Sequence, residues 1–341
     1  LNIMPPFIAY GIGNGLHLPL SCGMEVILIP QFDPNKFDEL LLENKPNHMV
    51  GVPSHYGNII HSKKLKNEDL SYVIAPTVGG DKMDENLEKE TNEFLREHNC
   101  EYKVVKGYGM TEVNAAVAAC TSNETNKIGS VGIPFPNTTI SIFDPKTGEE
   151  LGYNEKGEVC ITGPNTMLGY FNNDEETNKI LRKHEDGNVW VHSGDIGYMD
   201  ADGNLYIVDR LKRMIIRPDG FKIFPSLIED VVVKHPSVQS CKAVGLRDFS
   251  FSQGKLPKVH VVLNETDRNP EAIENEILML CEEQLPEYYW PCEIEFNESL
   301  PLTPIGKIDY LKLEKEDYET AAACRDQIRA LKAGKGGEVH E

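Results

Sequence analysis

The 341-residue sequence lacks the signatures of several classes of protein. Its eight cysteines form no Cys-x-x-Cys pair and its ten histidines form no His-Glu-x-x-His array, so neither a disulfide framework nor a structural metal site is predicted. No apolar run approaches the roughly 18 residues that a membrane-spanning helix needs. The first residues lack the basic and apolar segments of a signal peptide, which predicts a cytoplasmic location.

Positive charge is also scarce. The chain has 34 Lys and Arg against 54 Asp and Glu, a formal net charge of −20. Because nucleic acids are bound through a basic footprint, they are not predicted partners. Five basic residues nevertheless gather within a stretch that contains one acid, Asp219: they are Arg210, Lys212, Arg213, Arg217 and Lys222. This cluster predicts contact with an anion, and a solvated loop is the alternative.

Length and patterning predict an α/β multidomain protein. At roughly 100–200 residues per domain, the chain has room for two or three domains. In residues 1–125, strand-like runs alternate with helical patterns, which is typical of an α/β subdomain with a parallel sheet. The expected strands are 25–30, 48–53, 72–75 and 104–107, and the expected helices are 37–44, a helix after Pro53, and 84–98.

Two further patterns of secondary structure are predicted along the chain. Residues 126–209 contain short strands between turn sequences, which predicts a small antiparallel sheet or β-barrel-like subdomain. Its expected strands are 139–143, 157–161 and 205–208. Residues 213–318 predict a compact α+β domain, with helices at 226–234 and 270–284 and strands at 240–245, 259–263 and 292–296. Residues 319–341 predict an exposed helical tail.

The pentapeptide at 108–112, Tyr-Gly-Met-Thr-Glu, follows a predicted strand. Ligands gather where the strands of a parallel sheet end. The ring of Tyr108 can stack on a base, the hydroxyl of Thr111 can bond a phosphate, and the carboxylate of Glu112 can hold Mg²⁺. This motif predicts a nucleotide site, and a turn with Thr111 as a helix cap is the alternative.

Three other motifs carry polar groups suited to a nucleotide. Asp195 can accept hydrogen bonds from both ribose hydroxyls, and Arg210 could meet the same ribose. Gly79 and Gly80 allow close approach of the backbone, and Asp81 opens the predicted helix, where anions are favoured. Ordinary turns with an aspartate are the alternatives. Lys307 ends the sequence Pro-Ile-Gly-Lys at 304–307, where a solvated lysine is the alternative.

These motifs, in this order and spacing, resemble the adenylate-forming superfamily of acyl-CoA synthetases, luciferases and adenylation domains of peptide synthetases. The resemblance runs from about Leu1 to Leu313. It implies an ATP-dependent carboxylate–CoA ligase. In the implied reaction, the carboxylate of a fatty acid or another carboxylic acid attacks the α-phosphate of Mg·ATP to give acyl-AMP and pyrophosphate. The thiol of CoA then attacks the acyl group, which gives the thioester and releases AMP.

The resemblance also implies roles for individual residues. Lys307 would bridge the carboxylate and the α-phosphate, Thr111 would contact phosphate, and Glu112 would hold Mg²⁺. The adenosine site would consist of Gly79, Gly80, Asp81, Tyr108, Gly109, Asp195 and Arg210. A hinge at residues 210–212, centred on Lys212, would let the carboxyl-terminal domain move between the two half-reactions. The thioester loop would contain Arg217, Gly220, Phe221 and Lys222, and Tyr56 would limit the acyl pocket.

One part of the family pattern is missing from the sequence, namely the Thr/Ser/Gly-rich loop that holds the β- and γ-phosphates. We expect the chain to be the carboxyl-terminal portion of a longer ligase. A protein that binds a nucleotide without turnover is one alternative, and an adenylation module that loads a carrier protein is another. The sequence leaves the acyl substrate and a homo-oligomeric state open.

Overall fold

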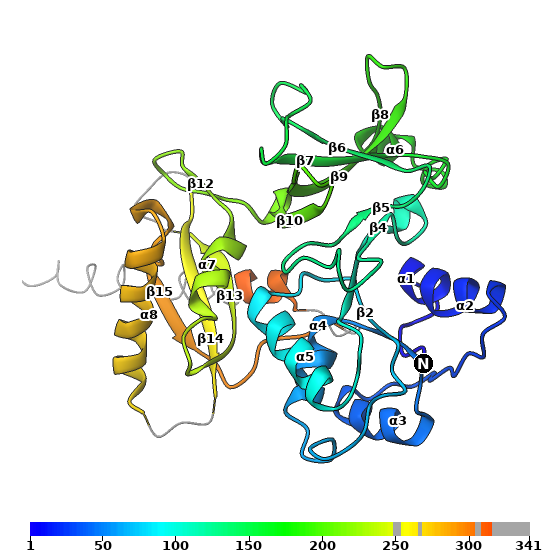
Figure 1. The fold of residues 1–341 in the computed structure, drawn as a ribbon. Helices are drawn as coiled ribbons and strands as arrows, with labels where there is room; N and C mark the ends of the chain where they lie inside the picture. The colour runs from blue at the N-terminus through cyan, green and yellow to red at the C-terminus, as the bar shows by residue number, and fades with distance from the viewer. Residues whose placement is uncertain (248–253, 265–267, 304–307, 316–341) are drawn as a thin grey trace, which may run out of the picture. The chain divides into compact units, whose positions relative to one another are not determined.

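The computed structural model describes residues 1–247, 254–264, 268–303 and 308–315. Lys307 and the tail expected at 319–341 lie outside the described residues. The chain divides into two compact units, here called unit 1 (Leu1–Lys212) and unit 2 (from Arg213 onward). Figure 1 shows the elements of both units along the chain.

The first sheet of unit 1 has five strands in the order β1-β2-β3-β4-β5. Strands β1 (His48–Gly51), β2 (Ala75–Val78) and β3 (Val105–Tyr108) are parallel, as predicted. Strands β4 (Ala118–Ala119) and β5 (Ile133–Pro134) add an antiparallel edge. The motif at 108–112 therefore begins where the parallel strand β3 ends.

The helices of unit 1 follow its apolar periodicity. Helices α3 (Phe37–Asn44), α4 (Pro53–Ile60) and α5 (Glu85–Glu97) match the expected helices to within one residue at each end where bounds were predicted. Helix α5 begins at Glu85 because the Asp84 side chain accepts hydrogen bonds from the N–H groups of Asn86 and Leu87. The chain opens with three shorter helical elements, α1 (Ala9–Ile12), η1 (Gly13–His17) and α2 (Leu18–Ser21).

Two expected strands of unit 1 are wrong. Residues 25–30 form no strand, and only Leu28 makes an isolated bridge, to Asn2. Leu28 is largely exposed, so this apolar run lies at the surface and not between neighbouring strands. Residues 72–74 lie in a turn and a bend, and the strand begins only at Ala75 and runs to Val78. The sequence pattern does not predict strand β2, because Pro76 within it removes a hydrogen bond of the strand ladder and so argues against a strand.

The second sheet of unit 1 is antiparallel, as predicted, with the order β10-β9-β7-β6 and with β8 also pairing with β9. Its strands are β6 (Thr139–Phe143), β7 (Gly157–Thr162), β8 (Leu181–Lys183), β9 (Val189–Met199) and β10 (Leu205–Arg210), with helix α6 (Asp174–Ile180) before β8. Among the described strands β6 and β10 do not pair, so the sheet is open and not a closed barrel. Short 3-10 turns lie at Pro34–Lys36 (η2) and Thr111–Val113 (η3).

Unit 2 has the predicted α+β composition. Strand β14 (Leu256–Leu263) lies between antiparallel β13 (Val238–Leu246) and parallel β15 (Glu293–Phe296). Helices α7 (Pro225–Val232) and α8 (Pro270–Gln284) share one apolar core with these strands. The unit also contains a hairpin of β11 (Ile215–Ile216) and β12 (Lys222–Ile223), and 3-10 turns η4 (Leu211–Arg213, at the junction with unit 1) and η5 (Glu287–Tyr289). None of the described helices is both long and apolar enough to cross a bilayer.

A buried carboxylate, Glu229 of α7, links the elements of unit 2. Its two oxygens pair with Arg213 at 2.6 Å and with Lys242 at 2.9 Å. It also accepts a hydrogen bond from the Ala243 N–H at 3.0 Å. Burial opposes ionisation of Glu229, but Lys242 and Arg213 outweigh it and lower its pKa to about 2. The charged carboxylate therefore stabilises the folded unit at neutral pH.

We expect unit 2 to lose stability as the pH falls from about 4.5 to about 2, since Glu229 titrates near 4.5 when unfolded and near 2 when folded. The contribution is fully present above the unfolded pKa and amounts to about 3 kcal/mol. Urea unfolding can be followed by Trp290 fluorescence in a Trp190→Phe background. Glu229→Gln should remove this part of the pH dependence. An equal loss of stability in the wild type and Glu229→Gln would contradict the prediction.

Candidate nucleotide-binding site

Three residues expected to contact adenosine converge in unit 1. The Tyr108 hydroxyl, at the end of β3, donates a hydrogen bond to Oδ2 of Asp195 in β9 at 2.7 Å. Nε of Arg210, the last residue of β10, lies 3.1 Å from Oδ1 of Asp195. Asp195 and Arg210 are direct cross-strand partners. The structure thus joins both sheets of unit 1 at one carboxylate.

The Asp195 side chain is buried, whereas the side chain of its partner Arg210 is exposed to solvent. The exposed fractions of the two side chains are 5% and 68% respectively. Burial raises the pKa of Asp195, although Arg210 and the hydrogen bond from Tyr108 oppose that shift. Burial and the nearby Asp195 carboxylate also raise the pKa of Tyr108, so the phenol keeps its proton and acts as a donor. Arg210 can turn toward a ligand from its exposed position, whereas Asp195 is held in place.

Glu112 has a partner that the sequence analysis missed. The Tyr170 hydroxyl donates a hydrogen bond to Oε1 of Glu112, and the Met167 N–H donates to the Glu112 carbonyl. Burial and Glu112 raise the pKa of Tyr170 to about 12. No local pattern indicated this contact, because 58 residues separate Tyr170 from Glu112. A half-buried carboxylate held on one oxygen is a chemically suitable ligand for Mg²⁺.

The structure changes the local interpretation of two motifs. Thr111 is exposed and is not a helix cap, because Met110 occupies the cap position of η3. Asp81 does not lie at a helix N-terminus, since α5 is capped by Asp84. The Asp81 carboxylate instead accepts a hydrogen bond from the Lys82 N–H. The helix N-terminus therefore gives no anion-binding argument for Asp81, and its nucleotide role rests on the family resemblance.

At the three glycines of the predicted site, a larger residue would be strained or would come too close to a neighbour. Gly80 has a φ of +79°, where other residues are strained. A Cβ on Gly109 would come within 1.7 Å of the Ala115 carbonyl oxygen, so a larger residue would displace the loop after β3. A Cβ on Gly79 would lie 3.2 Å from the Tyr10 ring. Tyr56 is fully buried in the same core, and its hydroxyl donates to the Thr77 carbonyl at 3.0 Å.

The expected thioester loop is the turn of the β11–β12 hairpin in unit 2. The Arg217 guanidinium pairs with Asp219 at 2.9 Å and donates to the Tyr288 carbonyl at 3.0 Å. Gly220 has a φ of +87°, and Phe221 is half exposed and stacks on Tyr288. Lys222 is exposed at the start of β12, and Lys212 is exposed as the last residue of unit 1.

The basic cluster at 210–222 is less positive than its composition suggested. Arg210, Arg213 and Arg217 each pair with a carboxylate, from Asp195, Glu229 and Asp219 respectively. Asp195 and Glu229 lie outside residues 210–222, so a count of charges within the cluster does not include them. Contact of this segment with an anion stays a prediction.

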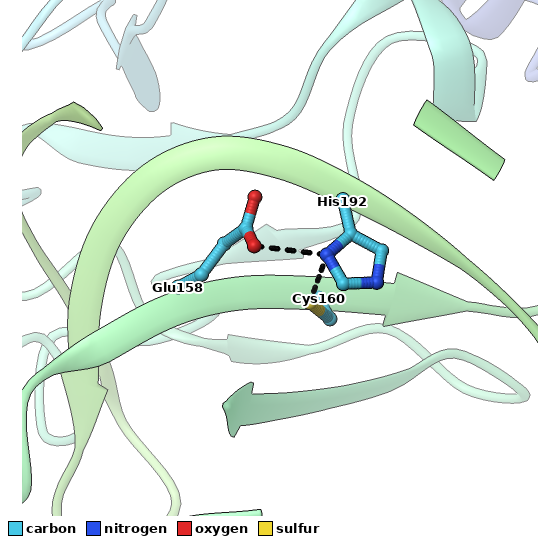
Figure 2. Close-up of side chains that lie close together, drawn as sticks. All are labelled: Glu158, Cys160 and His192. Carbon is cyan, nitrogen blue, oxygen red and sulfur yellow. Dashed lines mark hydrogen bonds and ion pairs between the residues drawn. The ribbon is translucent and has the colours of Figure 1, made fainter. Parts of the chain in front are cut away.

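A second set of polar side chains, also missed by the sequence analysis, lies on β7 and β9 near Asp195. Figure 2 shows Glu158, Cys160 and His192 of this cluster. The ring nitrogen Nδ1 of His192 lies 2.8 Å from Oε2 of Glu158 and 3.5 Å from the Cys160 sulfur. All three residues are buried. Each offers one atom that could ligate a metal ion (a carboxylate oxygen, a sulfur or a ring nitrogen), and these atoms lie within 4.8 Å of one another. Cys160 and His192 are cross-strand partners, so the sheet register brings the cluster together.

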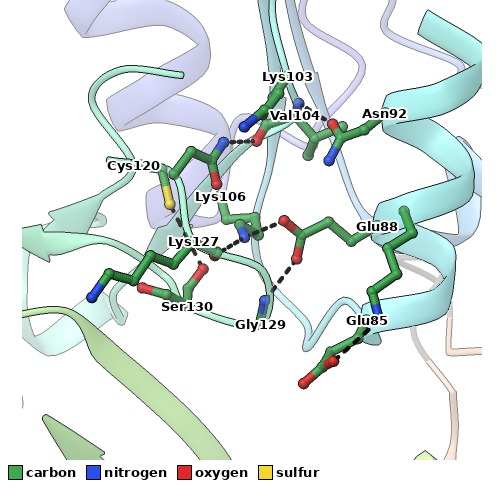
Figure 3. Close-up of polar contacts among 12 residues, drawn as sticks. Glu85, Glu88, Asn92, Lys103, Val104, Lys106, Cys120, Lys127, Gly129 and Ser130 are labelled. Carbon is green, nitrogen blue, oxygen red and sulfur yellow. Dashed lines mark hydrogen bonds and ion pairs between the residues drawn. The ribbon is translucent and has the colours of Figure 1, made fainter. Parts of the chain in front are cut away.

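A buried ion pair supports the strand that leads to Tyr108. Nζ of Lys106 on β3 pairs with Oε1 of Glu88 on α5 and donates to the Lys127 carbonyl at 2.7 Å (Figure 3). The second oxygen of Glu88 accepts a hydrogen bond from the Gly129 N–H at 2.9 Å. Both side chains are at most 5% exposed. The pair ties α5, β3 and the loop at residues 127–129 together, two residues before Tyr108.

Comparison with protein families identifies the family of the chain. The model of the AMP-binding enzyme family matches residues 1–171, and that of the AMP-binding enzyme C-terminal domain matches residues 227–307. The chain therefore belongs to the AMP-binding, adenylate-forming enzymes, as its motifs predicted. A short UvrB/uvrC motif model also matches residues 313–334, most of which lie outside the described part.

Individual relatives agree with this family. The chain is 33% identical over 94% of its length to a long-chain-fatty-acid–CoA ligase of Bacillus subtilis, and 34% identical over 90% to a probable 4-coumarate–CoA ligase 1 of Dictyostelium discoideum. It covers 54% of each relative, so it spans about half the length of the curated relatives it matches.

Solved structures show the same multidomain fold. A benzoate CoA ligase from Burkholderia xenovorans matches with a TM-score of 0.78 and 26% identity, over 91% of this chain and 59% of that one. The amide bond synthetase McbA from Marinactinospora thermotolerans matches with a TM-score of 0.74 and 28% identity, over 87% and 58%.

Proposed function

We propose that this protein acts as an ATP-dependent carboxylate–CoA ligase through an acyl-adenylate. Its substrates are a carboxylic acid, ATP and CoA. The family matches support the adenylate-forming class, and the relatives are named as CoA ligases for fatty, coumaric and benzoic acids. All three acid classes share a carboxylate, which is the group that the reaction activates. By the family resemblance, Tyr56 would limit the pocket that selects the acyl part.

The observation that carries this proposal is the convergence of Tyr108, Asp195 and Arg210. The contact between Tyr108 and Asp195 spans 87 residues and places an aromatic ring beside a carboxylate and a cation. An adenosine monophosphate offers a base to stack, two vicinal hydroxyls to donate and an anionic phosphate. The three groups are complementary to these features in chemical type.

The remaining residues supply the chemistry of adenylation. Glu112 would hold Mg²⁺, which when bound neutralises phosphate charge. Thr111 would donate its hydroxyl to phosphate, and Lys307, outside the described residues, would place its ammonium between the carboxylate and the α-phosphate. These groups position reactants and stabilise developing charge without a covalent enzyme intermediate. The hinge at Lys212 would bring the loop of Arg217, Gly220, Phe221 and Lys222 into use for thioester formation.

Lys307→Ala tests whether Lys307 acts in adenylation and not in thioester formation. We expect acyl-adenylate formation to slow by about 10²–10³-fold, because one preorganised donor to the developing charge is lost. Thioester formation from supplied acyl-adenylate should stay near the wild-type rate. Pyrophosphate release and CoA thioester are measured with protein expressed from the full coding sequence. The control is Lys312→Ala, which changes an exposed lysine five residues later in the sequence. Wild-type rates of both half-reactions in Lys307→Ala would refute the assignment.

A second acceptor is a separate candidate for the last step. The amide bond synthetase McbA shares the fold at 28% identity, which makes an amine a second candidate acceptor beside CoA. Both reactions begin with the same adenylate and differ only in the nucleophile that displaces AMP. Offering CoA and simple primary amines to the enzyme-bound adenylate, and identifying the product by mass spectrometry, decides between them.

A further inference from the structure

The segment that carries Asp195 is a bulge in the second sheet of unit 1. Strand β9 pairs with β7 at Glu158–Ile196 and again at Cys160–His192. Between these pairs, Val159 of β7 stands opposite three residues of β9, namely Ser193, Gly194 and Asp195. Gly194 has a φ of +69°, which helps the bulged strand to bend. Bulges of this kind re-aim a side chain, and they are frequent beside active sites.

Two side chains fasten this bulge to β7. Oε1 of Glu158 accepts a hydrogen bond from the Gly194 N–H at 3.1 Å. The Ser193 hydroxyl donates to the Val159 carbonyl at 2.6 Å and accepts from the Asp195 N–H at 3.0 Å. The N–H groups of the consecutive residues Gly194 and Asp195 are therefore both held by hydrogen bonds to side chains. The direction of the Asp195 carboxylate follows from this backbone geometry.

Glu158 is itself held in position by a chain of rings. Its Oε2 accepts from Nδ1 of His192 at 2.8 Å, and Nε2 of His192 lies 2.9 Å from Nε2 of His184. When Nδ1 of His192 donates to Glu158, its Nε2 is the acceptor in the bond from His184. The His184 ring stacks on Trp190 and meets Phe143 edge-on. Burial opposes ionisation of Glu158, but its bonds from His192 and Gly194 keep its pKa below the usual value. The residue is thus a fixed carboxylate with two occupied oxygens.

We propose that Glu158 and Ser193 are positioning residues for nucleotide recognition, which fix the bulge so that the Asp195 carboxylate meets the ribose hydroxyls. This inference rests on the proposed role of Asp195 in ribose binding. Neither residue is assigned a contact with the nucleotide. Glu158 acts through the orientation of Asp195, and hence on the ribose hydroxyls, whereas the Ser193 side chain also interacts with Tyr108.

The test compares binding of AMP with binding of 2′,3′-dideoxy-AMP, which lacks both hydroxyls. The ratio of the two dissociation constants reports ribose recognition and cancels general losses of affinity. In Glu158→Met, which keeps the size of the side chain but removes both acceptors, we expect this ratio to fall by about tenfold or more. Glu158→Gln should keep most of the ratio, because its amide oxygen still accepts from Gly194 and its amide N–H groups can donate to His192.

The matched control is Glu155→Met. The Glu155 carboxylate also accepts a hydrogen bond from a backbone N–H, that of Gly152 at 2.8 Å, in a loop of the same unit. The ratio of the two dissociation constants should keep its wild-type value in Glu155→Met. If Glu158→Met does not fold, Ser193→Ala carries the same expectation, because it removes the other fastening. A wild-type ratio in a folded Glu158→Met or Ser193→Ala protein overturns this inference. A wild-type protein that binds AMP and its dideoxy analogue equally overturns the ribose site itself.

Discussion

Asp195→Ala should weaken binding of AMP to this chain by about 10²–10⁴-fold. The reason is that a buried carboxylate would accept a hydrogen bond from each of two ribose hydroxyls, and each bond to a charged group is worth about 1.5–3 kcal/mol. Every 1.4 kcal/mol changes the dissociation constant about tenfold. The substitution also leaves the Tyr108 hydroxyl without its partner, which adds to the loss.

Isothermal titration calorimetry of the wild type and Asp195→Ala measures this effect directly. AMP has no β- or γ-phosphate, so the experiment does not depend on a phosphate loop. Circular dichroism confirms that each protein is folded. Asp202→Ala is the control, because Asp202 is an exposed turn aspartate of the same unit that pairs with Lys127. Equal affinities of the wild type and Asp195→Ala, or a folded wild type that does not bind AMP, would contradict the site.

Glu88→Ala should lower the free energy of unfolding of unit 1 by about 3–5 kcal/mol. It leaves the Lys106 ammonium buried without its carboxylate. Removing one partner of a buried ion pair destabilises a protein far more than replacing both partners by apolar residues. The Gly129 N–H loses its acceptor as well. Because Lys106 lies two residues before Tyr108, AMP binding should weaken along with stability.

Urea unfolding, followed by Trp190 fluorescence in a Trp290→Phe background, measures this loss in unit 1. The double variant Glu88→Leu/Lys106→Met should recover most of the stability, since it replaces both charges by apolar groups of similar size. Glu85→Ala is the matched control on the same helix. Its pair with Lys89 is exposed and should change stability by less than about 1 kcal/mol. A loss in Glu88→Ala no larger than in Glu85→Ala would show that the buried pair does not stabilise the unit.

The sequence by itself determined the elements whose signals are local. Helices α3 and α8 have the predicted bounds, and α5 differs by one residue at each end, because apolar periodicity and capping residues act within a few residues. The antiparallel strand β6 has the predicted bounds for the same reason. The motif at 108–112, together with Asp195, Arg210 and Lys307, needs only residue type, order and spacing, and this is enough to predict the enzyme family that the comparisons confirm.

Only the tertiary structure decided which of these groups meet. The hydrogen bond between Tyr108 and Asp195, the pairing of Glu112 with Tyr170 and the clamp of Glu158 on Gly194 each join residues at least 36 positions apart. Such contacts depend on sheet register and on the bulge at Ser193–Asp195, which shifts every later cross-strand partner. Burial was decided in the same way, because whether a charge such as Glu88 or Glu229 is covered depends on the elements packed around it, and not on its neighbours in the chain.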